Sequence, residues 1–393
     1  MGSGKGTSDP KKEPDGTACP VGVASCIVGE SRRGLSVISE IVADIWWKRA
    51  KGCRRLLEIP LAAASLLYRV GLGLDQSRKA KRARRLPRPV VSVGNVTVGG
   101  TGKTPVTLWL ARQVEEMGKI PCILSRGYGS EGKKPRRVEP GCADWRKYGD
   151  EPVLLADRLG TGKVYVGQDR WRAGYLALEE DDGIDLFLLD DGFQHRQLAR
   201  DRDVVLVDAE RHFGNNRLLP WGPLREPMES LSRADFVGLI HRSRAFPSSA
   251  EALSNPVELP IALGPIGWSV PGERRIRPLS ELSGDRPAWL LSGIGHPQGF
   301  EQTVRECGLE VAHHSIYRDH HPYSRSDLQR EIEAAGSHGA RLVTTAKDAV
   351  RMRNHLSIWT RKDDLTIIEL GVIAGDGLEY LRNVLKELLA EGS

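Results

Sequence analysis

The chain has 393 residues, of which 40% are hydrophobic and 27% charged, so it has the length and composition of a globular protein with room for two domains. This balance excludes a chain that is disordered throughout. The six cysteines are scattered and include no Cys-x-x-Cys pair, which indicates reduced cytoplasmic thiols and disfavours a disulfide framework or a cysteine-based zinc module. The net charge of +6 comes from one segment, because residues 48–88 hold 13 Lys or Arg and only two carboxylates.

Residues 1–40 are rich in Gly, Ser, Lys and Pro and show no sustained hydrophobic period. This composition is typical of a disordered tail, to which we assign no function. The stretch GSGKG at residues 2–6 follows no strand that could aim a phosphate-binding loop, so we interpret it as linker-like composition.

Residues 41–88 form the basic segment, and we expect a helix within it. The run IPLAAASLLY at 59–68 is continuously apolar and has basic residues on both flanks. Ten helical residues extend about 15 Å, half of a bilayer's hydrocarbon thickness, so the run is too short to span a membrane. Two interpretations remain open: a helix that lies in an anionic membrane interface, or a core helix with a solvated basic neighbour.

The pattern changes at residue 89 to alternating strands and helices. Residues 89–94 and 120–124 are apolar runs typical of buried strands, and residues 103–117 between them carry apolar side chains at helical spacing. Strand, loop, helix and strand in this order form a right-handed unit with parallel strands. Two more buried strands are predicted at 184–191 and 203–208. We therefore expect an α/β fold whose core, at 89–217, is a P-loop NTPase-like parallel sheet flanked by helices.

The remainder of the chain predicts a second, smaller α/β domain. The passage 218–230 is rich in Pro and Arg and is predicted to be a linker. Strand-like runs with helical segments between them then recur through 231–375, which we expect to close over the site of the first domain. Residues 376–393 predict a C-terminal helix.

Residues 97–104, TVGGTGKT, match a phosphate-binding loop, except that Thr97 stands where the first glycine is usual. Glycines let backbone N–H groups face phosphate oxygens, Lys103 can reach the β- and γ-phosphates, and Thr104 can ligate Mg²⁺. A strand before the loop and a helix after it make the pattern specific and disfavour a structural turn. The predicted nucleotide-binding residues of the loop are Thr97, Val98, Gly99, Gly100, Thr101, Gly102, Lys103 and Thr104.

A Mg²⁺ site is predicted at the end of a neighbouring strand. The stretch LFLLDDGFQH places Asp190 and Asp191 directly after a buried run. Alone, Asp-Gly after a strand is a common turn, but beside a phosphate-binding loop the metal interpretation is favoured. A GTPase is disfavoured because TAKDA has Ala349 where the guanine-reading motif needs an aspartate.

Several stretches together resemble the tetraacyldisaccharide 4′-kinases of lipid A biosynthesis. The resemblance extends over roughly residues 45–390 and is carried by SVGNVTVGGTGKTP, LSRGYG, GDEPVLLA, LLDDGFQHRQLARDRDVVLVD, FGNNRLLPWGPLREP and DHHPYSRSDL. It implies transfer of the γ-phosphate of ATP, with Mg²⁺, to the 4′-hydroxyl of an acylated glucosamine disaccharide 1-phosphate. It also implies a peripheral, monotopic enzyme at the cytoplasmic face of a Gram-negative inner membrane. The lipid substrate favours the interfacial interpretation of the basic helix.

The resemblance also assigns roles to residues. Asp150 alone is typical of a helix cap, but it matches the family's catalytic base, and His320 matches the histidine that orients this base. With Lys103 and Asp191 these form the predicted catalytic set. Other predicted site residues are Gln194 and His195 for nucleotide phosphates, Thr104, Asp190, Asp191 and Glu226 for Mg²⁺, and Arg126 and Arg225 for substrate or transferring phosphate.

The sequence departs from the family pattern at four positions. His296 stands where Asn is expected and Ala346 where Glu is usual, while Asn216 and Trp221 replace smaller residues. None of these positions belongs to the phosphate-binding loop or to the paired aspartates.

A rival from another class is a P-loop ATPase that binds nucleic acid through the basic run at 78–88. This run has almost no interleaved aromatic residues and lies beside an apolar segment, which favours an anionic membrane surface as partner. We expect no nucleic-acid partner and a monomeric enzyme.

Overall fold

The computed structural model describes residues 42, 45–47, 58–127, 130, 132, 134–142, 144–242, 256–359, 364–375 and 377–391. Asp44–Ser393 form one compact unit. The tail predicted at 1–40 lies outside the described residues, as does most of the stretch that precedes residue 58.

The described strands form one twelve-stranded sheet in the order β10-β9-β11-β12-β8-β7-β6-β1-β5-β2-β4-β3. Neighbouring strands are parallel except in the pairs β3/β4 and β8/β12. The strands are β1 Val90–Asn95, β2 Pro121–Ser125, β3 Arg136–Arg137, β4 Lys163–Val166, β5 Leu186–Asp190, β6 Arg202–Asp208, β7 Phe236–His241, β8 Val257–Ser269, β9 Ala288–Ser292, β10 Val311–Ile316, β11 Arg341–Thr345 and β12 Leu365–Ala374. The mixed α/β class predicted from sequence is confirmed.

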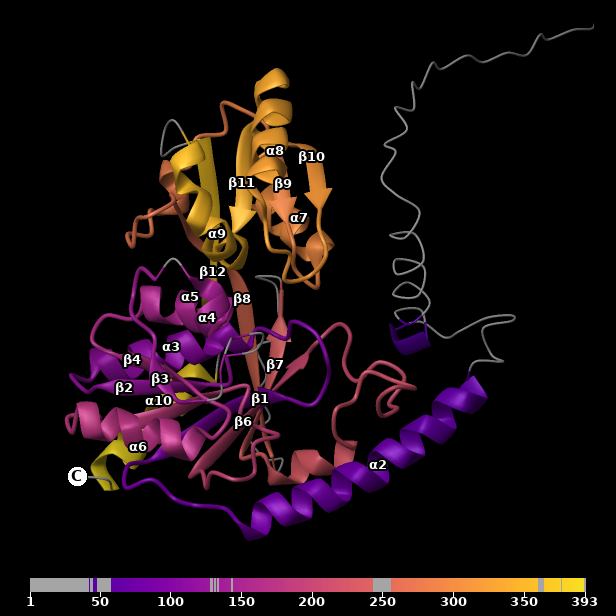
Figure 1. Cartoon of the computed structure of the whole chain (residues 1–393), viewed down its shortest axis with the longest axis vertical. Helices are drawn as coiled ribbons and strands as arrows, with labels where there is room; N and C mark the ends of the chain where they lie inside the picture. The colour runs from indigo at the N-terminus through magenta and orange to yellow at the C-terminus, as the bar shows by residue number, and fades with distance from the viewer. Residues whose placement is uncertain are drawn as a thin grey trace, which may run out of the picture. The chain divides into compact units, whose positions relative to one another are not determined.

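Helices accompany these strands throughout the chain (Figure 1). They are α2 Glu58–Lys81, α3 Lys103–Glu116, α4 Trp145–Tyr148, α5 Asp150–Arg158, α6 Arg170–Glu180, α7 Pro297–Glu306, α8 Arg325–Ser337, α9 Ala346–Met352 and α10 Leu378–Glu391, with 3₁₀ turns η2 Met228–Arg233, η3 Leu279–Glu281 and η4 Arg353–Ile358. Helix α10 lies within the predicted C-terminal helix and buries Leu381, Leu385 and Leu388 in the same cluster as α3.

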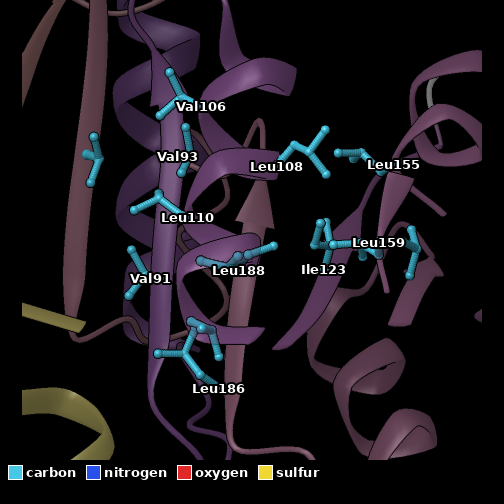
Figure 2. Packing of buried hydrophobic residues seen from close by; sticks show 14 of the residues in the cluster. Val91, Val93, Val106, Leu108, Leu110, Ile123, Leu155, Leu159, Leu186 and Leu188 are labelled. Carbon is cyan, nitrogen blue, oxygen red and sulfur yellow. The ribbon is translucent and has the colours of Figure 1, made fainter. Parts of the chain in front are cut away.

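The apolar core around α3 fixes the phosphate-binding loop at the carboxyl edge of the sheet. Figure 2 shows Val91 and Val93 of β1, Leu188 of β5, and Val106 and Leu110 of α3 in one cluster. All six residues of β1 are buried, as expected for a central parallel strand. The pairing of β1 with β5 sets Val93 opposite Asp190, so the first aspartate of the pair ends its strand beside the loop that follows β1.

The sheet is continuous across the predicted linker at 218–230. Strand β7 pairs with β6 of the core, and β8 then pairs with β7 through residues 257–262 and with β12 through 262–269. Figure 1 shows β9, β10 and β11 beyond β12, with α7 and α8 beside them. The division into domains at 89–217 and 231–375 stays a proposal, since strands from both ranges share this sheet.

Helix α2 is a single helix of 24 residues that leaves its apolar side chains uncovered. Only Ser65 is buried in it, whereas Ile59, Leu66, Leu67, Val70 and Leu74 are between 57% and 75% exposed. The core-helix interpretation of 59–68 is therefore wrong. Among the described residues, no helix combines the length and apolarity needed to cross a membrane.

Two polar contacts attach α2 to the segment that we predict as a linker. The Ser65 hydroxyl donates to the carbonyl of Leu218 at 3.1 Å, and the Tyr68 hydroxyl donates to the carbonyl of Arg225 at 2.9 Å. The indole of Trp46 donates to the carbonyl of Pro220 at 3.0 Å. The loop at 218–225 is thus held from the side of α2.

Candidate active site

The phosphate-binding loop joins β1 to α3 and has the backbone conformation that its glycines predict. Gly99 and Gly102 have φ of 112° and 80°, in the left-handed region that favours glycine. A Cβ at Gly102 would also collide with the Leu263 side chain. The loop is fixed from the other side by residues 223–224, because the Val98 N–H donates to the carbonyl of Pro223 at 2.8 Å and Thr97 bridges to Leu224.

Two cations hold Asp191 beside this loop. The Lys103 Nζ lies 3.6 Å from Asp191 Oδ1 and donates to Asn95 Oδ1 at 3.4 Å. The Arg225 guanidinium donates to both carboxylate oxygens of Asp191 at 3.0 Å. Burial alone would raise the pKa of Asp191, but the charges of Lys103 and Arg225 lower it below its ordinary value. Asp191 therefore stays ionised, next to the lysine that the motif assigns to phosphate.

Asp190 is the more deeply buried member of the pair. Its side chain lies 1% exposed, Oδ2 accepts from the Ser125 hydroxyl at 3.3 Å, and Oδ1 has no hydrogen-bond partner. Burial, together with the charges of Glu151 and Asp191, raises the pKa of Asp190 to about 7. A buried acceptor with elevated basicity and an unused oxygen fits a cation that arrives with its ligand.

These residues fit Mg²⁺ bound jointly by protein and nucleotide. Among the described residues, no group of three or more His, Cys, Asp or Glu could enclose a metal alone. Mg²⁺ usually takes one or two carboxylates and completes its shell with phosphate oxygens and water. Asp190, Asp191 and Thr104 could supply that partial set. The Glu226 carboxylate is fully buried and pairs with Arg233 at 2.8 Å, and its Oε1 has no hydrogen-bond partner.

Asp150 and His320 form the predicted pair, although 170 positions separate them in the sequence. The His320 Nδ1 lies 2.9 Å from Asp150 Oδ2, and Asp150 Oδ1 accepts from the Glu151 N–H at 2.9 Å. Burial raises the pKa of Asp150, but the hydrogen bond and charge of His320, with the charges of Arg351 and Lys347, lower it overall. The hydrogen bond to Asp150 raises the pKa of His320. The Asp150 carboxyl is therefore ionised at neutral pH.

Lys347 connects this pair to the paired aspartates. Its ammonium forms an ion pair with Glu151 and interacts electrostatically with both Asp150 and Asp190. Burial favours the neutral amine, but the charge of Glu151 outweighs it and raises the pKa of Lys347. The Asp150–His320 pair and Asp190 thus share one electrostatic environment.

The remaining predicted residues are Gln194, His195 and Arg126, of which Gln194 contacts the arginine that binds Asp191. The Gln194 amide donates to the carbonyl of Asn95 at 2.9 Å and accepts from Arg225 at 3.4 Å. The His195 Nε2 is buried without a partner, and burial, with the charge of Arg170, lowers the pKa of His195 to about 3. Arg126 is exposed after β2 and lies near enough to Arg170 to lower its pKa. A neutral His195 and these arginines suit an anionic ligand.

Sequence reasoning missed Glu151, Arg170, Lys347 and Arg351. Arg170 begins α6, is 4% exposed, and its Nε has no hydrogen-bond partner. Lys347 and Arg351 come from α9, four residues apart on one helix, and this spacing was the available signal. Their partners on α5 lie about two hundred residues away in the chain, which no local pattern shows.

The comparisons with known proteins agree with this geometry. Residues 57–376 match the family model described as tetraacyldisaccharide-1-P 4′-kinase. The chain belongs to this family. The tetraacyldisaccharide 4′-kinase of Syntrophobacter fumaroxidans is 38% identical over 352 residues, which cover 84% of this chain and 90% of the relative. That of Syntrophus aciditrophicus is 40% identical over 339 residues, covering 76% and 89%.

A solved structure from the same family also matches. LpxK from Aquifex aeolicus, crystallised in complex with ATP, is 28% identical, with a TM-score of 0.69 over 85% of this chain and 99% of that one. As a member of the 4′-kinase family, the chain is an ATP-dependent kinase that works with Mg²⁺. The nucleic-acid ATPase alternative receives no support from these comparisons.

Two departures from the 4′-kinase pattern lie near the site. His296 caps the N-terminus of α7, and burial, with the charges of Arg211 and Arg242, lowers the pKa of His296 to about 4. Arg242 also donates to the carbonyl of Gly100 in the phosphate-binding loop at 2.7 Å. Ala346 is the first residue of α9 and packs against the core cluster of α3.

Proposed function

We propose that the chain transfers the γ-phosphate of ATP to the 4′-hydroxyl of a tetraacyl glucosamine disaccharide 1-phosphate, a lipid A precursor. The observation that carries the proposal is the meeting of two sets of residues. Lys103 and Asp191 lie at the phosphate-binding loop. A different lysine, Lys347, interacts electrostatically both with Asp150 of the Asp150–His320 pair and with Asp190. A kinase with an alcohol acceptor needs both a phosphate cradle and a nearby base.

Asp150 accepts the proton of the 4′-hydroxyl as the phosphoryl group moves. His320 orients the carboxylate through Nδ1 and stabilises its charge. Lys103 and Arg225 neutralise the oxygens of the transferring group, and Arg126 is proposed for the substrate's own phosphate. Asp190, Asp191, Thr104 and Glu226 would hold Mg²⁺ bound with ATP, and this ion would supply polarisation of the phosphates.

Gln194 and His195, with residues 97–104 of the loop, complete the proposed nucleotide site. The region that carries His320 is proposed to close over the core during turnover, which would exclude water and protect ATP from hydrolysis. The His320–Asp150 contact supports this, because it joins the loop after β10 to α5.

The proposed partner surface is an anionic membrane at the cytoplasmic face of the inner membrane, with a monomeric, monotopic enzyme. Helix α2 supports it through two features. Its exposed apolar side chains recur at helical spacing, and its last turn carries Arg78, Lys79 and Lys81. An apolar face with basic neighbours suits the boundary between anionic headgroups and acyl chains, where the acylated substrate resides.

Transfer of label tests the function directly. The full chain is incubated with Mg-ATP labelled at the γ-phosphate and tetraacyldisaccharide 1-phosphate in detergent micelles, and the lipid is separated. We expect label in the lipid in proportion to ADP formed. ADP formation that leaves the lipid unlabelled, or that DNA or RNA stimulates instead, would overturn the proposal.

A further inference from the structure

Arg351 is a charged side chain buried almost completely beside the catalytic base. It lies on α9, and the residue is 2% exposed. A buried guanidinium is costly unless its donors are paired with acceptors or charges. The acceptors of its N–H groups therefore indicate which parts of the site the buried charge holds in place.

The guanidinium divides its contacts among four acceptors, and on its own helix Nε donates to the carbonyl of Lys347 at 3.3 Å. Nη2 donates to Asp348 Oδ1 at 2.9 Å, and Nη1 donates to the carbonyl of Gly293 at 2.9 Å. Nε lies 3.4 Å from Asp150 Oδ2, the same oxygen that faces His320. One rigid, planar group thus connects α9, the end of β9 and the base on α5.

Asp348 is saturated by other donors and serves Arg351 as a fixed counter-charge. Its Oδ1 accepts from the Tyr323 hydroxyl at 2.7 Å and from the Gly293 N–H at 2.9 Å, and its Oδ2 accepts from the Thr345 hydroxyl at 2.6 Å. Asp348 is completely buried. Because these bonds hold Asp348 in place, they hold Arg351 in place as well.

The same peptide unit positions His320. The His320 N–H donates to the carbonyl of Gly293 at 3.1 Å, the carbonyl that Arg351 also binds. The space around Gly293 is closed, since a Cβ there would lie 2.9 Å from the carbonyl oxygen of Arg318 and 3.1 Å from the Tyr323 hydroxyl. His320 itself has φ of 56°, which requires firm support from its surroundings.

We propose that Arg351, braced by Asp348, is a positioning residue of the kinase that holds both members of the Asp150–His320 pair in register and keeps Asp150 ionised. The proposal rests on the function proposed above. Arg351 acts through Asp150 and does not contact substrate. Among the described residues, the charged groups that act most strongly on Asp150 are His320, Arg351 and Lys347. Glu151 is next to Asp150 in the chain and paired to Lys347, and Asp319 faces His320.

The sign of the effect follows from these charges. Arg351 lowers the pKa of Asp150 and also lowers the pKa of His320. Removing its charge should raise both pKa values, so that Asp150 is protonated at a higher pH. Loss of one close opposite charge shifts a carboxyl pKa by about one unit or more.

The test compares Arg351→Gln with the wild type in kcat across pH. With saturating Mg-ATP, so that the bound cation holds Asp190 ionised, we expect the acidic limb of the profile to move up by about one pH unit, with about tenfold less activity below the limb and recovery above it. KM for ATP should stay within about twofold, because the phosphate-binding loop is untouched. A uniform loss at every pH, with an unshifted limb, would refute the positioning role.

Arg353→Gln is the matched control. Arg353, two positions along at the start of η4, forms an ion pair with Asp157 on α5 and donates to the carbonyl of Cys142 at 2.9 Å, so it ties the chain directly after α9 to α5 through a carboxylate other than Asp150. We expect reduced stability and an unshifted acidic limb in this variant. An equal shift in both variants would show that only the packing between α9 and α5 matters.

Two further measurements keep the proposal testable if Arg351→Gln does not fold or the acceptor is wrong. The double variant Asp348→Asn with Arg351→Gln leaves no unpaired buried charge, and it should show the same shift. NMR titration of His320 in the absence of substrate should give a higher pKa in this double variant than in the wild type. An unchanged His320 pKa would refute the positioning role, whereas wild-type enzyme that fails to phosphorylate the disaccharide would refute the proposed acceptor alone.

Discussion

At Asp150, burial and the neighbouring charges act on the pKa in opposite directions. Asp150 is 3% exposed, which favours the neutral acid, yet the groups around it favour the carboxylate. Both oxygens are already engaged, one by the Glu151 N–H and the other by His320 and Arg351. Oδ1, which accepts from the Glu151 N–H, still has a lone pair for an incoming proton, so the contacts orient the carboxylate without occupying it fully.

Asp150→Asn should remove the ability of residue 150 to accept a proton while preserving the shape of its side chain. We expect kcat to fall by a factor of about 10²–10⁴, the range for loss of a positioned base, with little change in KM for ATP. Steady-state label transfer to lipid measures it. Asp157→Asn on the same helix is the control, because Asp157 pairs with Arg353 and caps the Gly141 N–H. Activity near wild type in the Asp150 variant would remove its role as base.

At the scale of elements, local pattern was sufficient for the nucleotide half of the site. The strand, glycine loop and helix are adjacent in sequence, so β1, the loop and α3 follow from residues 89–117 alone. The N-terminus of α3 and the end of β5 then meet because parallel neighbours end at one edge of the sheet. The acid-base half needed the family resemblance, since its contacts join α5 to α9 and to the loop after β10.

Gly102→Ala should test whether the loop's shape depends on glycine. Its φ of 80° is strained for any other residue, and a methyl group would also press on Leu263. We expect a loss of about 1–3 kcal/mol in the free energy of unfolding, measured by urea denaturation without nucleotide. Gly100→Ala is the control, because nothing lies within 4 Å of its Cβ position. Equal stability of the two variants would contradict the interpretation that the conformation of the loop depends on Gly102.

At the scale of the whole molecule, β8 joins strands from both predicted domains into one sheet. The stretch VELPIALGPIGWS contains Pro260 and Pro265, which are typical breakers of a central strand. Pro260 lies in the half of β8 that pairs only with β7, and Pro265 in the half that pairs only with β12, at a register shift. Each proline therefore lies where one side of the strand needs no N–H donor, and the strand persists.

The exposed apolar side chains of α2 should determine how strongly the protein binds to lipid vesicles. Leu67→Glu replaces a side chain that is 75% exposed on this face, and losing its burial in an interface costs about 1.5–3 kcal/mol, which is about ten- to hundredfold in partition. Co-sedimentation with anionic phosphatidylglycerol vesicles measures it. Ile316→Glu, at a 55% exposed position on β10, is the control and should not change vesicle binding. Equal losses in both variants would place the lipid contact elsewhere.

The hydrogen bonds from Ser65 and Tyr68 give α2 a second role. Both hydrogen bonds end on carbonyls of the loop at 218–225. The last residue of this loop, Arg225, binds Asp191, and the carbonyl of Pro223 accepts from the Val98 N–H at the start of the phosphate-binding loop. A displacement of α2 is therefore passed through one loop to Asp191 and to the start of the phosphate-binding loop. We therefore expect a defect in α2 to lower kinase activity in detergent as well, where no bilayer is present.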